Sequence, residues 1–272
     1  MITESFALEL LAKVPQRAGL GCDYDGTIAP IVVDLTAARA LPGALGALHE
    51  LASELAVVVV VSGRPARFLA DRLELTSYRS PLRAFGLHGL EECLPDGSVR
   101  LRTGVVAWRP VIATAGDQLR ATLPAGILVE DKEYGVTAHW RSIGASGSDL
   151  EAIVARTKEV VLGVGAEHGL LPRPGKASVE LVPPLGIDKG TVVTELCGDL
   201  ERATYLGDDD GDLPAYQALD TLRASSGVQT VKIAVAGADA PRSLVDAADL
   251  VLDGPGAAVG FLIALAARLY KP

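Results

Sequence analysis

Carboxylates cluster at two places in this chain, each directly after a short apolar run. Asp23 and Asp25 follow the apolar residues 19–22, and Gly26 permits the chain to turn at that point. The second cluster, residues 207–212, contains four aspartates and also follows an apolar run. Two carboxylates this close resist simultaneous ionisation unless a cation lies between them. A ligand set of carboxylates and phosphate oxygens favours magnesium over zinc.

Two further motifs could bind an anion. The Ser-Gly-Arg segment 62–64 follows the apolar run 57–61 and offers a hydroxyl and free amides at a predicted helix N-terminus, which suits a phosphate oxygen. Asp188 suits the N-cap of a later helix, but the cation at Lys189 opposes the helix dipole, so this lysine could be directed at an anion. Each motif alone is also typical of an ordinary turn or of a solvated surface.

Short, continuous apolar runs alternate along the chain with amphipathic segments. The apolar runs predict strands buried on both faces of a parallel sheet: residues 19–22, 57–61, 203–206 and 231–235. The amphipathic segments predict helices: one following Pro42, one opening at Pro65, and residues 191–200 and 257–270. This alternation indicates the α/β class, with a doubly wound, Rossmann-like sheet. Ligands bind beyond the carboxyl ends of the strands in such a sheet, which is where these motifs fall.

The middle of the chain follows another pattern. Polar and apolar residues alternate with period two in the segments 128–132, 136–141 and 176–182, which is typical of a sheet with one open face. The polar positions that share faces are Glu130, Lys132, Thr137, His139, Arg141, Lys176, Ser178 and Glu180. A helix over residues 148–161 is expected to cover the apolar side, where Trp140 packs. We therefore expect an α+β domain, residues 104–183, inserted into an α/β core formed by residues 1–103 and 184–272.

Composition restricts the class of protein. The chain carries 25 Lys and Arg against 34 Asp and Glu, a formal net charge of −9, and no basic run, which argues against nucleic acid or an anionic membrane as a partner. The longest apolar stretches are shorter than the roughly 20 residues that span a bilayer, and the first residues do not resemble a signal peptide. The three cysteines are far apart and lack the spacing of a zinc site. We expect a soluble, cytoplasmic protein that acts on a small molecule.

Taken in order, the motifs resemble those of the haloacid dehalogenase superfamily: Asp-x-Asp-Gly-Thr at 23–27, a serine after the next core strand, a later lysine and a final Gly-Asp-x-x-x-Asp. The insert lies where the C2-type caps of that superfamily lie. More narrowly, the chain resembles the trehalose 6-phosphate phosphatase family in the stretches 23–32, 61–65, 86–91, 129–132, 139–141, 179–184 and 186–190. It departs from the family pattern at residues 210–213, which read Asp-Gly-Asp-Leu instead of Val-Thr-Asp-Glu, and at Leu87, where Asn or Glu is usual.

The resemblance implies a magnesium-dependent phosphatase that hydrolyses trehalose 6-phosphate through an aspartyl-phosphate. Asp23 would be the nucleophile and Asp25 the general acid and base, while Lys189 would stabilise the charge of the transferring phosphate. The residues that bind or orient the phosphate would be Thr27, Ser62, Gly63, Arg64 and Asp212. The ligands of Mg²⁺ would be Asp23, the backbone carbonyl of Asp25, and Asp208.

The same resemblance places the sugar on the inserted domain. Its binding residues would be Glu130, Lys132, Lys176 and Glu180, with His139 and Arg141 on the same polar face. A trehalose-phosphate synthase of the same pathway is a candidate protein partner.

Other functions stay open at this point. The same chemistry could act on another sugar phosphate, such as a glycosylglycerate or sucrose phosphate, and phosphosugar mutases share the Asp-x-Asp-Gly-Thr motif. A catalytically silent protein could bind a sugar phosphate and regulate a partner such as a synthase, although both Asp23 and Asp25 are present. The polar face of the insert could also be a solvated surface held by salt bridges.

Overall fold

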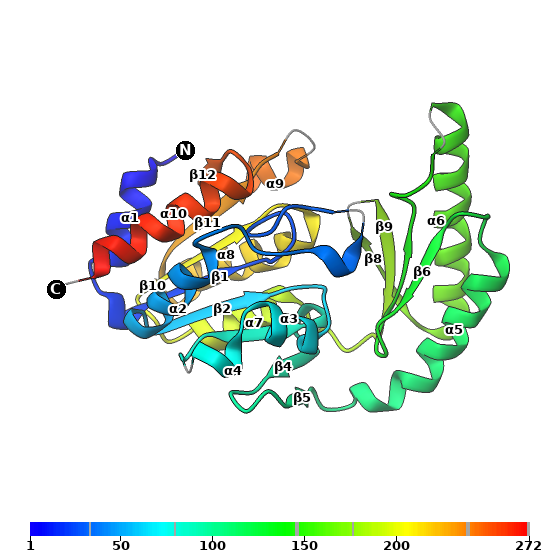
Figure 1. Ribbon diagram of the computed structural model, residues 1–272, viewed down its shortest axis with the longest axis horizontal. Helices are drawn as coiled ribbons and strands as arrows, with labels where there is room; N and C mark the ends of the chain where they lie inside the picture. Colours follow the sequence, from blue (N-terminus) through cyan, green and yellow to red (C-terminus); the bar gives the residue numbers. More distant parts are fainter. Residues whose placement is uncertain (33, 79, 145–146, 176, 238–239, 271–272) are drawn as a thin grey trace. The chain divides into compact units, whose positions relative to one another are not determined.

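The chain folds into two compact units in the computed structural model. One unit comprises Met1–Arg100 and Ile187–Pro272, and the other comprises Leu101–Gly186 (Figure 1). The structure describes the whole chain except residues 33, 79, 145–146, 176, 238–239 and 271–272.

The first unit, hereafter the core, is built on an eight-stranded sheet of order β12-β11-β10-β1-β2-β3-β4-β5. Its strands are β1 Ala18–Cys22, β2 Val57–Val61, β3 Arg83–Gly86, β4 Glu91–Cys93, β5 Val99–Leu101, β10 Arg202–Gly207, β11 Gln229–Val235 and β12 Leu250–Leu252. Strand β1 pairs in parallel with both β2 and β10, and every residue of β1 is buried. Burial on both faces explains why the central strands are continuously apolar. The strands predicted from the four apolar runs are therefore confirmed.

Helices cover both faces of the core sheet (Figure 1). They are α1 Glu4–Ala12, α2 Ala44–Glu54, α3 Ala66–Arg72, α4 Leu75–Tyr78, α7 Lys189–Cys197, α8 Leu213–Ser226, α9 Arg242–Ala247 and α10 Gly254–Leu269. One apolar core includes residues of α1, α2, α3 and α10, and a second includes residues of α7, α8 and α9. Two such layers confirm the doubly wound α/β architecture. Asp188 caps helix α7, as the sequence predicts, and forms a capping box with Thr191.

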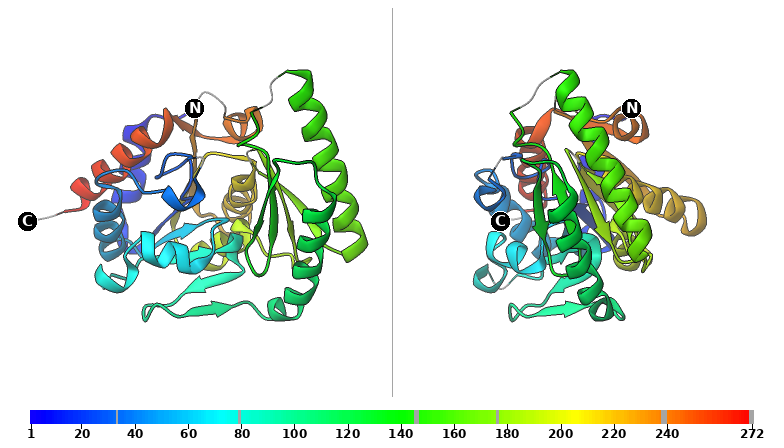
Figure 2. Two further views of the ribbon diagram at one scale, coloured as in Figure 1. Left: turned by 45° about the vertical axis from the view of Figure 1, so that its right-hand side comes forward. Right: turned by 90° about the vertical axis from the view of Figure 1, so that its right-hand side faces the viewer.

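The second unit, hereafter the cap, contains a four-stranded antiparallel sheet of order β6-β7-β9-β8. Its elements are α5 Arg109–Thr122, β6 Leu128–Asp131, β7 Val136–His139, α6 Ser148–His168, β8 Leu171–Gly175 and β9 Ser178–Val182. Both helices pack on one face of this sheet (Figure 2). Helix α6 runs past the predicted end at residue 161 and stops at Gly169, whose positive φ of 67° suits a helix C-terminus.

Two cap elements have no counterpart in the sequence-based expectation, namely α5 and β8. Strand β8 reads Leu-Pro-Arg-Pro-Gly, and its prolines argue against a strand. They are tolerated because β8 lies at the edge of the sheet and pairs only with β9, so the missing amide donors leave no second ladder incomplete.

Among the residues that the structure describes, no helix is both long and apolar enough to cross a membrane.

Candidate active site

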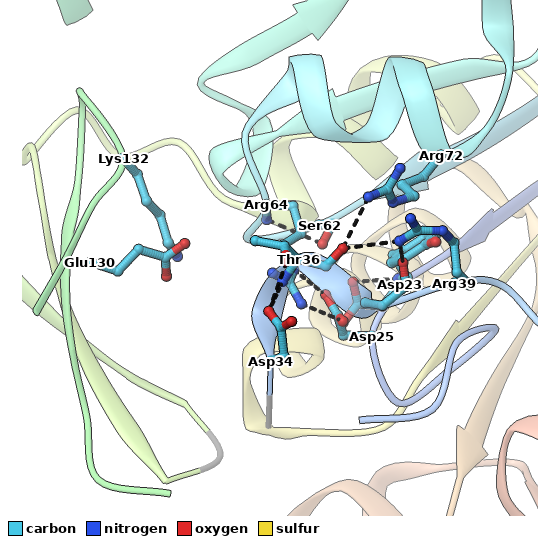
Figure 3. Close-up of polar contacts among 12 residues, drawn as sticks. Asp23, Asp25, Asp34, Thr36, Arg39, Ser62, Arg64, Arg72, Glu130 and Lys132 are labelled. Carbon is cyan, nitrogen blue, oxygen red and sulfur yellow. Dashed lines mark hydrogen bonds and ion pairs between the residues drawn. The ribbon is translucent and has the colours of Figure 1, made fainter. Parts of the chain in front are cut away.

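The motifs singled out in the sequence meet at one edge of the core sheet. Asp23, Ser62 and Asp208 each directly follow one of three adjacent strands, β1, β2 and β10, which all run in the same direction. Lys189 is the first residue of α7. Figure 3 shows Asp23, Asp25, Ser62 and Arg64 gathered at this edge. The carboxyl ends of parallel strands therefore bring together residues that are far apart in the sequence.

Lys189 joins two aspartates of this site. Its Nζ lies 3.0 Å from Asp23 Oδ2 and 2.7 Å from Asp212 Oδ1, and the lysine side chain is only 2% exposed. Burial alone would lower the pKa of Lys189, but the charges of Asp212 and Asp23 outweigh it and hold the pKa above its ordinary value. The lysine is thus a fixed cation beside the predicted nucleophile.

Asp212 is completely buried and accepts four hydrogen bonds. Its Oδ1 accepts from Lys189 Nζ and, over 3.1 Å, from the hydroxyl of Tyr205. Its Oδ2 accepts from the backbone amides of Asp208 and Asp209, at 2.9 and 3.3 Å. These bonds occupy the lone pairs of the carboxylate, so its geometry suits an orienting residue better than a metal ligand.

Asp23 and Asp208 are two acidic groups of this edge whose ionisation is opposed by their surroundings. Burial is the main cause that raises the pKa of both; the other carboxylates raise them further, and Lys189 opposes the shift. The pKa of Asp23 rises to about 8 and that of Asp208 to about 9. Carboxylate oxygens of Asp23, Asp208 and Asp212 lie within 4.8 Å of one another. A buried pair of carboxylates that resists ionisation is the donor set that a hard divalent cation satisfies.

Gly26 leaves room for the side chain of Asp208. A Cβ on Gly26 would lie 1.9 Å from Asp208 Oδ2, and the φ of Gly26 is +82°, which favours glycine. Thr27, expected among the residues that orient Asp25 or the phosphate, donates to Asp208 Oδ1 over 3.5 Å. The turn after β1 therefore places Asp208 next to the Asp23 segment.

Asp25 lies at the same edge but has a different partner. Its carboxylate accepts two hydrogen bonds from Arg64, from Nε at 2.6 Å and from Nη2 at 2.8 Å (Figure 3). The Arg64 guanidinium lies 4.8 Å from the ring centroid of Phe68, in a cation–π contact. In this structure the guanidinium of Arg64, expected to bind phosphate, is thus directed at Asp25.

Ser62 and Gly63 form the turn after β2. Ser62 is buried, and its hydroxyl accepts from the backbone amide of Arg64 over 3.2 Å. A Cβ on Gly63 would lie 2.8 Å from Nε2 of His88, so glycine is needed for this close approach. Figure 3 shows Ser62 at the same edge of the sheet as Asp23 and Asp25.

The cap sheet has one apolar and one polar face, as the alternation predicts. Val136, Ala138 and Leu181 belong to the apolar core with α5 and α6, and Trp140 packs against it. The other face carries two ion pairs, Lys132 with Glu180 at 3.0 Å and His139 with Glu130 at 2.9 Å. Arg141 follows β7 and is half-buried, whereas Lys176 lies outside the described residues.

Two residues of the polar cap face were not assigned a role from the sequence. Arg173 of β8 is in register with Glu180, and the prolines on either side of it hid the strand. Thr137 is in register with both Glu130 and Glu180, is 2% exposed, and its hydroxyl has no hydrogen-bond partner among the described residues. Alternation placed Thr137 on the face of His139, but only the strand register shows it between two carboxylates.

Comparisons with known proteins agree with this architecture. The C-terminal domain of the Candida albicans trehalose-6-phosphate phosphatase superposes with a TM-score of 0.78, at 21% identity, over 98% of this chain and 97% of that one, so the two share a fold. The C-terminal domain of the Candida albicans trehalose synthase regulatory protein superposes with a TM-score of 0.68, at 14% identity, over 96% and 98%. The fold is therefore shared with a protein named as regulatory.

The sequence comparisons identify the family. The model of the trehalose-phosphatase family matches residues 22–247, and the chain belongs to this family. The trehalose-phosphate phosphatase of Mycolicibacterium paratuberculosis is 33% identical over 258 residues, which are 92% of this chain and 62% of that protein. That of Mycobacterium tuberculosis is 31% identical over 265 residues, 94% of this chain and 63% of that protein. The chain thus spans less than two thirds of the length of these relatives.

Proposed function

We propose that this protein hydrolyses trehalose 6-phosphate to trehalose and phosphate, with Mg²⁺, through an aspartyl-phosphate formed on Asp23. The observation that carries the proposal is the buried cluster in which Lys189 bridges Asp23 and Asp212 while Asp208 lies within 4.8 Å of both. A carboxylate next to a fixed cation and a second carboxylate is suited to attack phosphorus.

The reaction divides into two steps at Asp23. In the first, Asp23 attacks phosphorus, a bond from its oxygen to phosphorus forms, and the bond to the sugar oxygen breaks. Asp25 gives its proton to the leaving oxygen. In the second step Asp25, now ionised, takes a proton from the water that attacks the aspartyl-phosphate and releases phosphate.

The hydrogen bonds from Arg64 match one of the two protonation states that Asp25 takes in this reaction. A carboxylate that accepts two hydrogen bonds from a guanidinium is the ionised form, which the second step requires. For the first step Asp25 must carry a proton, so Arg64 has to give up at least one of these hydrogen bonds. The ion pair therefore changes during the cycle.

Lys189 and Ser62 hold the phosphate in this proposal. An ammonium group has three donors, and Lys189 directs two of them at Asp23 and Asp212, which leaves one for a phosphate oxygen. The Ser62 hydroxyl is the second donor, and the amide of Gly63 lies in the same turn. Both groups would neutralise or bind the charge that develops on the phosphate oxygens.

The metal fits the residues that are present. Asp23 and Asp208 would hold Mg²⁺ together with the backbone carbonyl of Asp25, because their buried carboxylate oxygens lie close enough to contact one ion. When bound, the ion neutralises negative charge on the phosphate. Asp212 keeps its four hydrogen bonds and orients Lys189.

The substrate is assigned to the cap. We propose residues 104–183 as the substrate-binding unit and residues 1–103 and 184–272 as the catalytic unit. The polar cap face offers both acceptors and donors, which suits the many hydroxyl groups of a disaccharide: Glu130, Lys132, His139, Arg141, Lys176 and Glu180. The names of the curated relatives favour trehalose 6-phosphate over another sugar phosphate.

A cytoplasmic location and a trehalose-phosphate synthase as a partner complete the proposal. All three cysteines are free and buried, which suits a reducing compartment. The synthase would supply the substrate, and the partnership is proposed on that chemistry alone.

Phosphate release from a panel of sugar phosphates tests the function. Wild type and Asp23→Asn are compared with magnesium and with EDTA. We expect metal-dependent release confined to trehalose 6-phosphate, and a loss of at least about a thousandfold in the variant, because the amide is not a nucleophile. Release from another sugar would discard the substrate assignment and keep the chemistry. No release from any ester, with tight binding of a sugar phosphate, would favour a regulatory protein of the same fold.

A further inference from the structure

Tyr205 lies beneath the cluster and takes no part in the chemistry described above. It belongs to β10, is completely buried, and its ring packs in the core between the sheet and α7 and α8. Its hydroxyl donates to Asp212 Oδ1 over 3.1 Å and lies 3.4 Å from the carbonyl oxygen of Val61. The phenol therefore places a single polar atom at the floor of the site.

Gly21 makes room for this ring. Gly21 and Tyr205 are direct neighbours in the parallel pairing of β1 and β10. A Cβ on Gly21 would lie 2.6 Å from Cδ2 of Tyr205, which is closer than any real contact of that kind. A glycine in the interior of a strand weakens it, so its presence is consistent with a need for close approach.

The hydroxyl of Tyr205 and the ammonium of Lys189 share one oxygen of Asp212. Two donors on Oδ1 and two amides on Oδ2 fix the plane of the carboxylate. Without the phenol, Oδ1 loses one donor and the carboxylate can rotate toward the lysine. Lys189 would then point less accurately at the phosphate on Asp23, and small misplacements of a charge-stabilising group are costly to the rate.

We propose that Tyr205 is a positioning residue for phosphoryl transfer: it fixes Asp212, and through it directs Lys189 at the phosphate. This inference rests on the proposed function of the same site. Gly21 is the second residue of this arrangement, because only a residue without a side chain leaves room for the Tyr205 ring.

Tyr205→Phe tests the inference, with Tyr216→Phe as its matched control. Tyr216 lies on α8, is 1% exposed and belongs to the same apolar core, but its hydroxyl has no hydrogen-bond partner among the described residues. Both variants remove one buried oxygen. We expect kcat to fall about tenfold in Tyr205→Phe with a smaller, at most several-fold rise in KM, on a sugar phosphate and on an aryl phosphate alike. Tyr216→Phe should match wild type.

A purely structural role predicts other results. If Tyr205→Phe lowers the unfolding midpoint but leaves kcat unchanged, or if both variants lose the same activity, the inference is overturned. A change in KM alone would also overturn it, since Lys189 acts on the reacting group. Gly21→Ala, which displaces the ring, should lower kcat in the same direction as Tyr205→Phe.

Binding of inorganic phosphate separates this inference from the proposed function. Calorimetry on wild type, Tyr205→Phe and Tyr216→Phe, without turnover, should show several-fold weaker phosphate binding in Tyr205→Phe only. Equal affinities in all three would refute the role of Tyr205 even if wild type is an active phosphatase. An inactive wild type in which Tyr205→Phe still weakens phosphate binding would refute the function and keep the positioning role.

Discussion

The core and the cap each hold a lysine next to carboxylates, but the two charge clusters are built differently. Lys189 is shared by Asp23 and Asp212, and Asp208 adds a third carboxylate within reach, so negative charge is in excess. On the cap, Lys132 pairs with Glu180 and His139 pairs with Glu130. The core cluster therefore favours binding of a cation. In the cap pairs the numbers of basic and acidic side chains are equal, so these residues can exchange their hydrogen bonds with a neutral ligand.

Burial sharpens this difference. The side chain of Lys189 is 2% exposed and that of Asp212 is not exposed at all, whereas those of Lys132 and Glu180 are 9% and 7% exposed and those of Glu130 and His139 are 24% and 19% exposed. Charges without access to water are held rigidly, because any movement leaves one of them unpaired. A rigid core cluster suits a reaction at one phosphorus atom, and a more accessible cap face suits recognition of a sugar.

Replacing the lysine of each cluster with methionine tests this comparison. The larger effect is expected in the core. Lys189→Met leaves two buried carboxylates without their cation, so we expect a loss of about 3–5 kcal/mol in the free energy of unfolding. Activity toward every phosphate ester should fall at least about a hundredfold, because the fixed positive charge at the phosphate is gone. Chemical denaturation and phosphate release measure the two effects.

Lys132→Met is the matched variant on the cap. It should raise KM for the sugar phosphate about tenfold and leave kcat on a small aryl phosphate unchanged, because an aryl phosphate lacks the sugar that the cap pair is proposed to bind. Equal losses on both substrates, or a Lys132 variant that loses as much aryl-phosphatase activity as the Lys189 variant, would contradict the division of labour between core and cap.

The excess negative charge of the core predicts an effect of pH on stability. Without metal, the folded protein keeps protons on Asp23 and Asp208 up to pKa values of about 8 and about 9, whereas the unfolded chain loses them near pH 4. The native state then binds more protons than the unfolded state in this interval, so the free energy of unfolding falls as pH rises. Urea denaturation in EDTA between pH 5.5 and about 8.5 measures the slope.

Magnesium and Asp208→Asn are the controls for that slope. Added magnesium binds the ionised carboxylates of the folded state and should restore stability most at the alkaline end. Asp208→Asn removes one titrating group and should flatten the slope. A free energy of unfolding that increases with pH in EDTA would show that the core cluster is not short of positive charge.

The smallest expected effect concerns Thr137 on the cap. Its buried hydroxyl lies in register with Glu130 and Glu180 and has no hydrogen-bond partner among the described residues. Thr137→Val should change the free energy of unfolding by less than about 1 kcal/mol, since no hydrogen bond is lost. It should leave KM for the sugar phosphate within about twofold of wild type, because the buried hydroxyl is not accessible to a sugar.

Thr137→Ser keeps the hydroxyl and should retain the wild-type KM. Steady-state kinetics on the two variants, together with their denaturation curves, separate binding from folding. If Thr137→Val raises KM and Thr137→Ser does not, the hydroxyl becomes accessible when the sugar binds, and the expectation is wrong.

The local chain pattern predicted most of the elements that carry the site. Continuous apolar runs located the four strands β1, β2, β10 and β11, because burial on both faces leaves no polar position. Alternation located β6, β7 and β9 in the cap for the opposite reason. The sequence did not predict strand β8 or helix α5. Strand β8 was missed because its prolines argue against a strand, although they are tolerated at a sheet edge.

The hydrogen-bond and ion-pair partners of the side chains were less predictable from the sequence than the helices and strands. The sequence brought Lys189 and Asp23 into one motif set, but it did not indicate that Asp212 would be enclosed by four donors or that Arg64 would turn to Asp25. Tyr205 looked like one more residue of a buried strand. The proposal that Tyr205 positions Asp212 depends on its register with Gly21, which only the structure shows.

The sequence by itself determined that acidic and cationic groups stand at the ends of buried strands, because hydrophobic periodicity is a local property of the chain. The tertiary structure alone decided which of these groups touch. Thr27 reaches Asp208 across 181 positions, Arg64 reaches Asp25 across 39 and Lys189 reaches Asp212 across 23. Such pairs depend on the strand order β10-β1-β2, which packing sets and no local pattern encodes.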